Sequence, residues 1–276
     1  MVDAHAVPLL RHRAGSGEPL VLIHGVASSW RDWKPVLPAL ERRFDVVALA
    51  LPGHYEAPDF APRVPATVDG LIAAVATELD RLALARPHLA GNSLGGWIAL
   101  ELAARGRAVT VSALAPAGLA TAEEARAMER AVLRNHRLAR VVSALSPIVA
   151  HSRLVARMVL AGSVRDASRI DPRETAYKLN AFARCPRFRE LLRDLCARRV
   201  EHLADVRCPA LVVWGDEDRR LPVAHAERFA RAIPHARVAI LPGAGHLPMW
   251  DDPAAVAELI ADFALPEPAR AQAVAR

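Results

Sequence analysis

Residues 87–104 read PHLAGNSLGGWIALELAA. A short apolar run leads into the segment GNSLGG at residues 91–96, and a helix-like stretch follows it. This order predicts a strand, a sharp turn and a helix, with Ser93 raised above the carboxyl edge of a sheet. Such a turn brings backbone segments close together, so the residues two places before and after the serine must be small, as Gly91 and Gly95 are. A serine held in this way is a candidate nucleophile; the alternative is a glycine-rich turn whose serine only caps a helix.

The chain on both sides of this segment alternates between strand-like and helix-like stretches. Apolar spacing of three and four residues predicts helices over 68–85 and 252–264, the second with an Asp-Pro start. The alternation predicts an α/β fold, with a mostly parallel sheet and helices on both of its faces. Besides PHLA, the apolar runs that predict strands are residues 20–23, 46–49, 109–114, 210–214 and 238–241.

The alternation stops between residues 117 and 205, where amphipathic helices are predicted and strand-like runs are missing. We therefore expect a core built from residues 1–116 and 206–276, with residues 117–205 inserted as a helical cap. The predicted helices cover residues 121–145, 147–162, 172–183 and 186–199, and Thr121 with Glu124 forms a capping box at the first. The insert has 17 basic and 10 acidic residues, and the whole chain has a net charge of +6. This charge would attract anionic substrates or lie on solvated outer helix faces; the second arrangement is the commoner one.

Composition excludes several other classes of protein. The three cysteines, Cys185, Cys196 and Cys208, form no CxxC pair, so neither a disulfide framework nor a structural zinc site is expected. The N-terminus lacks a secretory pattern, and no apolar run is long enough to span a membrane, which favours a cytoplasmic location. Although the pI is near 10, aromatic residues make up only 5% and are not interleaved with the arginines, so nucleic acid is not an expected partner. Without a phosphate-binding, dinucleotide or metal motif, we expect a small-molecule substrate, no cofactor and no metal; the oligomeric state is left open.

A nucleophilic serine needs a base and a carboxylate to orient that base, and both follow Ser93 in the chain. Asp216, Glu217 and Asp218 come directly after the run 210–214. His246 follows the last predicted strand, in a loop whose glycines leave it free to turn inward. This order of serine, acid and histidine is typical of the strand-turn-helix nucleophile site.

An acyl-transfer site also needs hydrogen-bond donors for the oxyanion that forms during the reaction. The backbone N–H of Leu94, next to the nucleophile, is one candidate. The backbone N–H of Val26 is the second, because it follows the run 20–23, and we expect the nearby His24 to brace this loop rather than to act in catalysis. Trp30 and Trp97 are close to these positions in sequence and are tentative residues of the substrate pocket.

The segments LIHG (22–25), GNSLGG, WGDED (214–218) and GAGHLPMWDDP (243–253) occur in an order and spacing that resemble the α/β-hydrolase superfamily over residues 7–265. The resemblance implies an eight-stranded sheet, a helical cap inserted after the sixth strand and a serine nucleophile. It also identifies Asp218 as the acid, by similarity to a W-G-x-x-D pattern. The GNSLGG segment is similar to that of esterases, of carbon–carbon bond hydrolases acting on ring-cleavage products, and of cofactor-free perhydrolases.

These observations predict a serine hydrolase that cleaves a small or medium apolar ester with Ser93, His246 and Asp218. Carbon–carbon bond hydrolysis by the same three residues is the alternative, and a non-catalytic ligand-binding protein is the third interpretation. The chain departs from the resemblance at residues 50–55, where Ala50 and Tyr55 replace the first aspartate and the last glycine of D-x-x-G-x-G. This departure leaves the shape of one wall of the pocket open.

Overall fold

A computed structural model describes residues 8–145, 152 and 160–265. Its sheet has seven strands in the order β1-β3-β2-β4-β5-β6-β7, one fewer than expected. The antiparallel strand β1 forms one edge through its pairing with β3, and the described residues place no further strand beside it. All other neighbours are parallel. The strands are β1 (Leu10–Gly15), β2 (Glu18–Ile23), β3 (Phe44–Leu49), β4 (His88–Asn92), β5 (Val111–Leu114), β6 (Ala210–Gly215) and β7 (Arg237–Leu241).

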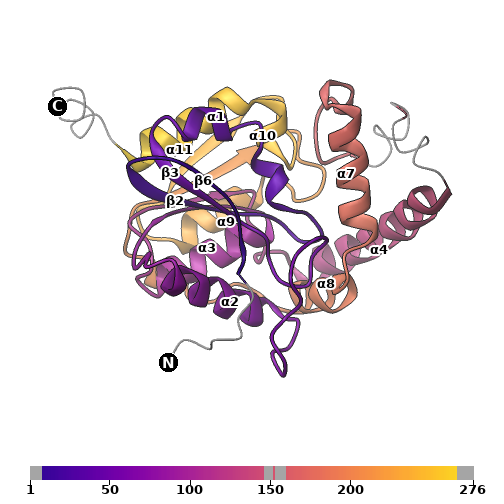
Figure 1. The fold of residues 1–276 in the computed structure, drawn as a ribbon, viewed down its shortest axis with the longest axis horizontal. Helices are drawn as coiled ribbons and strands as arrows, with labels where there is room; N and C mark the ends of the chain where they lie inside the picture. Colours follow the sequence, from indigo (N-terminus) through magenta and orange to yellow (C-terminus); the bar gives the residue numbers. More distant parts are fainter. Residues whose placement is uncertain (1–7, 146–151, 153–159, 266–276) are drawn as a thin grey trace.

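Helices cover both faces of the sheet (Figure 1), as expected for an α/β fold. Successive residues of a strand point to opposite faces, so Val21 and Ile23 pack in one hydrophobic cluster and Leu20 and Leu22 in the other. The first cluster lies under α2 (Val68–Arg81), α3 (Leu94–Ala104) and α9 (His225–Ala232). The second lies under α1 (Leu37–Leu40), α10 (Pro248–Asp251) and α11 (Pro253–Ala264), together with the 3₁₀ helix η1 (Trp30–Trp33).

Most of these strands and helices were predicted from the sequence. Every predicted strand run lies within or overlaps a strand of the sheet, and the helices predicted over 68–85 and 252–264 correspond to α2 and α11. The side chain of Asp252 caps α11 by accepting the N–H of Ala255 at 3.0 Å, and Pro253 occupies its first turn. Among the described residues, no helix has the length and apolar character needed to span a membrane.

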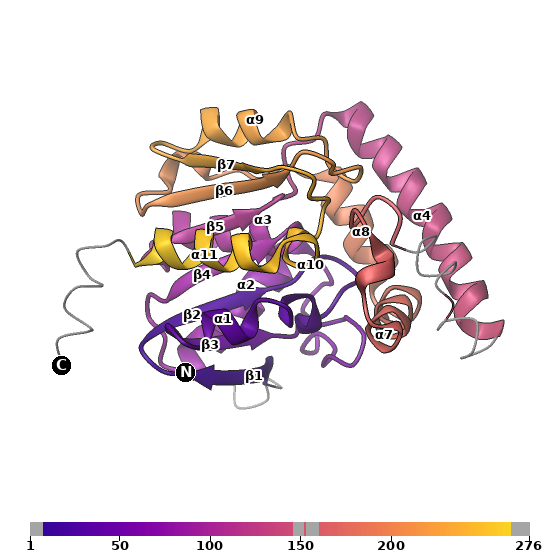
Figure 2. The same cartoon turned by 90° about the horizontal axis from the view of Figure 1, so that it is seen from above.

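Between β5 and β6 the chain leaves the sheet and forms the helices seen beyond the strand ends in Figure 2. The capping box predicted at residue 121 is present, since Thr121 N–H donates to Glu124 and the N–H of Glu124 donates to Oγ1 of Thr121. The predicted helix over 147–162 lies almost wholly outside the described residues. The described helices of the insert are α4 (Ala122–Leu145), η2 (Ala167–Arg169), α7 (Pro172–Ala183), α8 (Phe188–Ala197) and η3 (Leu203–Asp205).

The insert is joined to the rest of the chain by both charged and apolar contacts. Glu124 at the start of α4 forms two hydrogen bonds of 2.6 and 2.8 Å with Arg228 of α9. Leu191 and Leu195 of α8 are buried in the same cluster as the sheet residues. The outer face of α4 is solvated instead, because its arginines are exposed. Those arginines are Arg126, Arg130, Arg134, Arg137 and Arg140.

Candidate active site

Ser93 lies at the junction of β4 and α3 with φ of 56° and ψ of −116°. L-residues rarely adopt a positive φ, and holding one there costs about 1–3 kcal/mol. The close approach predicted around it is present. A Cβ atom added to Gly91 would lie 2.1 Å from the carbonyl oxygen of Gly95, and one added to Gly95 would lie 2.1 Å from that of Ile23. Only glycine therefore fits at both positions, and the turn presents the serine hydroxyl beyond the strand.

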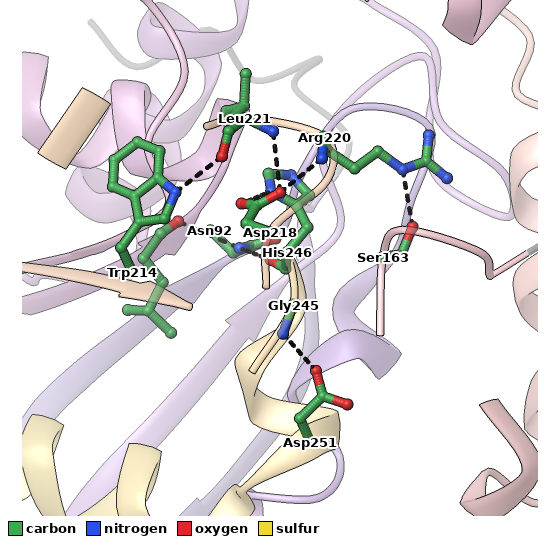
Figure 3. Close-up of polar contacts among 10 residues, drawn as sticks. Asn92, Ser163, Trp214, Asp218, Arg220, Leu221, Gly245, His246 and Asp251 are labelled. Atoms are coloured by element: carbon green, nitrogen blue, oxygen red, sulfur yellow. Dashed lines mark hydrogen bonds and ion pairs between the residues drawn. The ribbon is translucent and has the colours of Figure 1, made fainter. Parts of the chain in front are cut away.

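Asp218 and His246 form a hydrogen-bonded pair at the ends of β6 and β7 (Figure 3). His246 Nδ1 lies 2.8 Å from Asp218 Oδ2. The other carboxylate oxygen accepts the backbone N–H groups of Arg220 and Leu221 at 2.7 and 2.9 Å. The Asp218 side chain is fully buried, and the oxygens of a carboxylate only accept hydrogen bonds. The hydrogen of the bond between the two side chains therefore belongs to Nδ1 of His246. Nε2 of His246 is then the nitrogen available to accept a proton.

Further hydrogen bonds hold the loop that carries His246. Asp216 accepts the N–H of Gly243 at 2.6 Å, so it stabilises a turn and does not orient the histidine. Asp251 accepts the N–H of Gly245 at 2.8 Å, and Asn92, next to the nucleophile, donates to the carbonyl oxygen of His246 at 3.0 Å. The loop is therefore tied to the end of β6, to α10 and to the end of β4.

Ser93 and His246 line the same cavity, which has a volume of about 140 Å³. No hydrogen bond joins the Ser93 hydroxyl to His246 among the described residues; such bonds often tighten only when substrate is bound. The wall is largely apolar and includes Leu, Val, Met and Phe side chains of the insert. Its apolar residues are Val26, Ala27, Ala117, Met128, Val132, Leu160, Phe182, Leu192, Leu195, Leu221 and Leu247.

The two predicted oxyanion donors lie at suitable places. Leu94 is the first residue of α3, where a backbone N–H has no acceptor within the helix, and Val26 lines the cavity. His24 braces the intervening loop, as expected. Its Nδ1–H donates to the carbonyl oxygen of Gly25 at 2.8 Å, and its Nε2 accepts the N–H of Leu51 at 3.0 Å. Burial lowers the pKa of His24 to about 4, so the ring is neutral at pH 7.

The two tentative pocket residues lie elsewhere. Trp97 is 1% exposed and packs in the core cluster with Gly118 against its ring, because α3 is enclosed by its neighbours. Trp30 stacks on His12 with ring centroids 5.6 Å apart and packs against the cluster on the other face of the sheet. Neither residue lines the cavity. Trp97 is close to Ser93 in the sequence and Trp30 is close to Val26, but closeness in sequence does not determine which way a side chain points.

Several polar residues of the cavity were missed by sequence reasoning. Lys178 of α7 forms a buried ion pair with Asp32 of η1, and Ser28 donates to the other oxygen of that carboxylate. The Lys178 ammonium also lies 4.3 Å from the centre of the Trp250 ring. The chain has only two lysines, so the rarity of this residue was a usable signal. Arg220, on the loop that follows Asp218, is the cavity's other cation.

The departure at residues 50–55 shapes the contact between core and insert. His54 is buried with its ring centre 5.0 Å from that of His24, and burial lowers its pKa to about 3. Tyr55 packs edge-on against Tyr177 of α7. The carbonyl oxygen of Gly53 accepts the N–H of Arg187 before α8, at 3.0 Å. Nowhere in the described residues do three or more His, Cys, Asp or Glu side chains gather in a way that would hold a metal ion.

Comparison with known proteins agrees with this architecture. Residues 20–259 match the model of the alpha/beta hydrolase family. The chain is 35% identical over 237 residues to a dihydrolipoyllysine-residue acetyltransferase component of an acetoin cleaving system from Pseudomonas putida, covering 84% of this chain and 59% of that relative. It is 32% identical over 199 residues to the epoxide hydrolase EphH of Mycobacterium tuberculosis, covering 68% of this chain and 91% of that relative.

A solved structure of similar fold is that of a membrane phospholipase A, a bacterial virulence factor. It has a TM-score of 0.75 and 25% sequence identity, and the match covers 94% of this chain and 84% of that one. The family match spans most of the chain, from β2 to α11, and includes the Ser93 turn and the loops of Asp218 and His246. The chain belongs to the α/β hydrolase family.

Proposed function

We propose that this protein is a serine hydrolase that cleaves a small or medium, largely apolar ester through an acyl-enzyme. The observation that carries the proposal is the meeting of two independent features at one cavity. One is Ser93, held at a strained positive φ, and the other is His246, whose Nδ1 is bonded to the buried Asp218. Backbone strain of this kind is maintained where function requires it.

In the first half of the reaction, Oγ of Ser93 bonds to the ester carbonyl carbon and its proton passes to Nε2 of His246. The carbonyl π electrons move to oxygen, and the N–H groups of Val26 and Leu94 stabilise the resulting oxyanion. Asp218 stabilises the imidazolium. When the intermediate collapses, the bond to the alkoxy group breaks and that group takes the proton from His246. Water then repeats these steps on the acyl-enzyme and releases the acid.

The residue at position 93 supports acyl chemistry over epoxide opening. One relative is named an epoxide hydrolase. In the α/β-hydrolase superfamily that chemistry uses a carboxylate at the position of the nucleophile, whereas this chain has Ser93 there. Another relative is named an acetyltransferase component, a name that denotes transfer of an acyl group. Because this chain spans 59% of that relative, transfer to its acceptor is not inferred.

A fluorophosphonate probe tests the nucleophile directly. We expect one equivalent of adduct, located on Ser93 by mass spectrometry, and none on the Ser93→Ala variant. A panel of p-nitrophenyl esters of increasing acyl length should show activity that falls at long chains, because the cavity is small. An adduct on Ser28, Ser29 or Ser112 in place of Ser93 would remove the basis of the mechanism.

A further inference from the structure

Arg220 lines the cavity, and no carboxylate among the described residues forms a hydrogen bond or ion pair with its guanidinium. Its Nε donates to Oγ of Ser163 at 2.9 Å, the only side-chain bond drawn for it in Figure 3. Among the described residues its two terminal nitrogens have no hydrogen bond or ion pair. The two internal segments outside that description, 146–151 and 153–159, contain no Asp or Glu, so they supply no acid either.

The other cation of the cavity is in a different situation. Lys178 is neutralised by Asp32, and both are almost fully buried. Asp218 forms no direct ion pair with the guanidinium, because its oxygens are bonded to His246 and to two backbone N–H groups, one of them that of Arg220; its charge acts on Arg220 only from a distance and raises the pKa of the guanidinium. Burial lowers the pKa of the Arg220 side chain, which shows that its charge is partly removed from water. A charged group in such a place is stabilised by an opposite charge.

From this arrangement we infer that Arg220 binds a carboxylate of the substrate, so that the ester cleaved by Ser93 also carries an acid group. This inference rests on the proposed function and makes it more specific. The two terminal nitrogens present parallel N–H groups that match the two oxygens of a carboxylate. The bond from Nε to Ser163 holds the planar group in place before substrate arrives, which reduces the entropy lost on binding.

The cavity contents favour a carboxylate over a phosphate. Only one cation lacks an acidic partner among the cavity residues, and a carboxylate supplies one negative charge where a phosphate monoester supplies nearly two. Ser163, which accepts the bond from Nε of Arg220, also accepts the N–H of Leu247 through its carbonyl oxygen at 2.7 Å, so the guanidinium is held by a residue that bonds to the loop of His246. The acid group is therefore expected a few bonds from the scissile ester.

The test compares esters that differ only in this charge. Monomethyl glutarate has its carboxylate on the acyl side, and 3-acetoxypropanoate has it on the leaving-group side; each is paired with its primary carboxamide, which has a similar size and polarity. We expect wild-type kcat/KM to favour the carboxylate of at least one pair by about 10–100-fold, the range for a charge-assisted hydrogen-bonded pair. In Arg220→Gln this preference should disappear, and in Arg220→Lys part of it should remain.

Two controls separate binding of the acid group from support of the fold. Ser163→Ala removes the acceptor of Nε but keeps the charge, so it should retain a reduced preference for the carboxylate. The urea midpoint of unfolding of Arg220→Gln should stay close to that of the wild type. A loss in Arg220→Gln that is equal for both members of each pair would mean that Arg220 is only structural, and would overturn the inference.

If neither ester is hydrolysed, the affinity of the protein for the same compounds tests the role of Arg220. The same four compounds are titrated into Ser93→Ala and into Ser93→Ala/Arg220→Gln by calorimetry. Tighter binding of a carboxylate that depends on Arg220 supports the inference even if Ser93 is never acylated, in which case the proposed function fails alone. Equal binding of the acid and amide forms overturns the inference, whereas labelling of Ser93 would still support the proposed function.

Discussion

Replacing Asp218 with asparagine is the change whose outcome the hydrogen-bond geometry specifies most closely. The carboxylate accepts three hydrogen bonds, two from backbone N–H groups at one oxygen and one from His246 at the other. An asparagine side chain has one acceptor oxygen and one donor nitrogen. The two backbone donors select the orientation in which the amide oxygen faces them, and the amide nitrogen then faces Nδ1 of His246.

A donor at that position reverses the tautomer of His246. Nδ1 becomes the acceptor and Nε2 carries the hydrogen, so Nε2 no longer accepts the proton of Ser93. In serine proteases the same change lowers kcat by about 10⁴. We expect Asp218→Asn to lower kcat by about 10²–10⁴, which corresponds to about 3–5 kcal/mol in the activation barrier. Because two of the three hydrogen bonds remain, the free energy of unfolding should fall by only about 1–2 kcal/mol.

Asp216→Asn is the matched control on the same loop. Asp216 accepts only the N–H of Gly243 among its side-chain bonds in the described residues, and an asparagine oxygen can replace it there. We expect kcat to stay within about tenfold of the wild-type value. The assay is kcat for p-nitrophenyl acetate, with urea unfolding measured for each variant. An inactive Asp216→Asn beside an active Asp218→Asn would show that the acid is assigned to the wrong residue.

Two further predictions concern the contacts between insert and core. Lys178→Met leaves the buried Asp32 without a cation, so the free energy of unfolding in urea should fall by about 3–5 kcal/mol. Adding Asp32→Asn should recover part of this loss. A fall of less than about 1 kcal/mol would contradict the prediction. Arg228 lowers the pKa of Glu124 from its ordinary value of 4.5, so the unfolded chain binds this proton first as pH falls. Glu124→Gln should therefore cost about 1 kcal/mol at pH 7, and its difference from the wild type should shrink steadily below pH 4.5; a constant difference would refute this.

The turn around Ser93 was predictable because its determinants are local. The spacing of Gly91, Ser93 and Gly95 reflects contacts within one strand-turn-helix unit and with the adjacent strand. Chain order then pointed to Asp218 and His246, since parallel strands bring their carboxyl ends to one edge. Helix caps such as Thr121 and Asp252 were predictable for the same reason, because each bonds to a residue three positions away. β1 was missed because its sequence, LRHRAG, alternates half-buried and exposed positions at the edge of the sheet and has no continuous apolar run.

Local sterics and strand order decide the fold class and the identity of three candidate catalytic side chains, so both could be inferred from the sequence. The tertiary structure alone decided which side chains meet in the cavity. Asp32 and Lys178 are 146 residues apart, and their pairing depends on how the insert folds back over the oxyanion loop. Trp97 was expected at the pocket but points into the core, since packing around α3 sets its direction. Likewise, only the folded chain shows that no carboxylate of the described residues bonds to the guanidinium of Arg220, because ion pairs depend on distances in three dimensions.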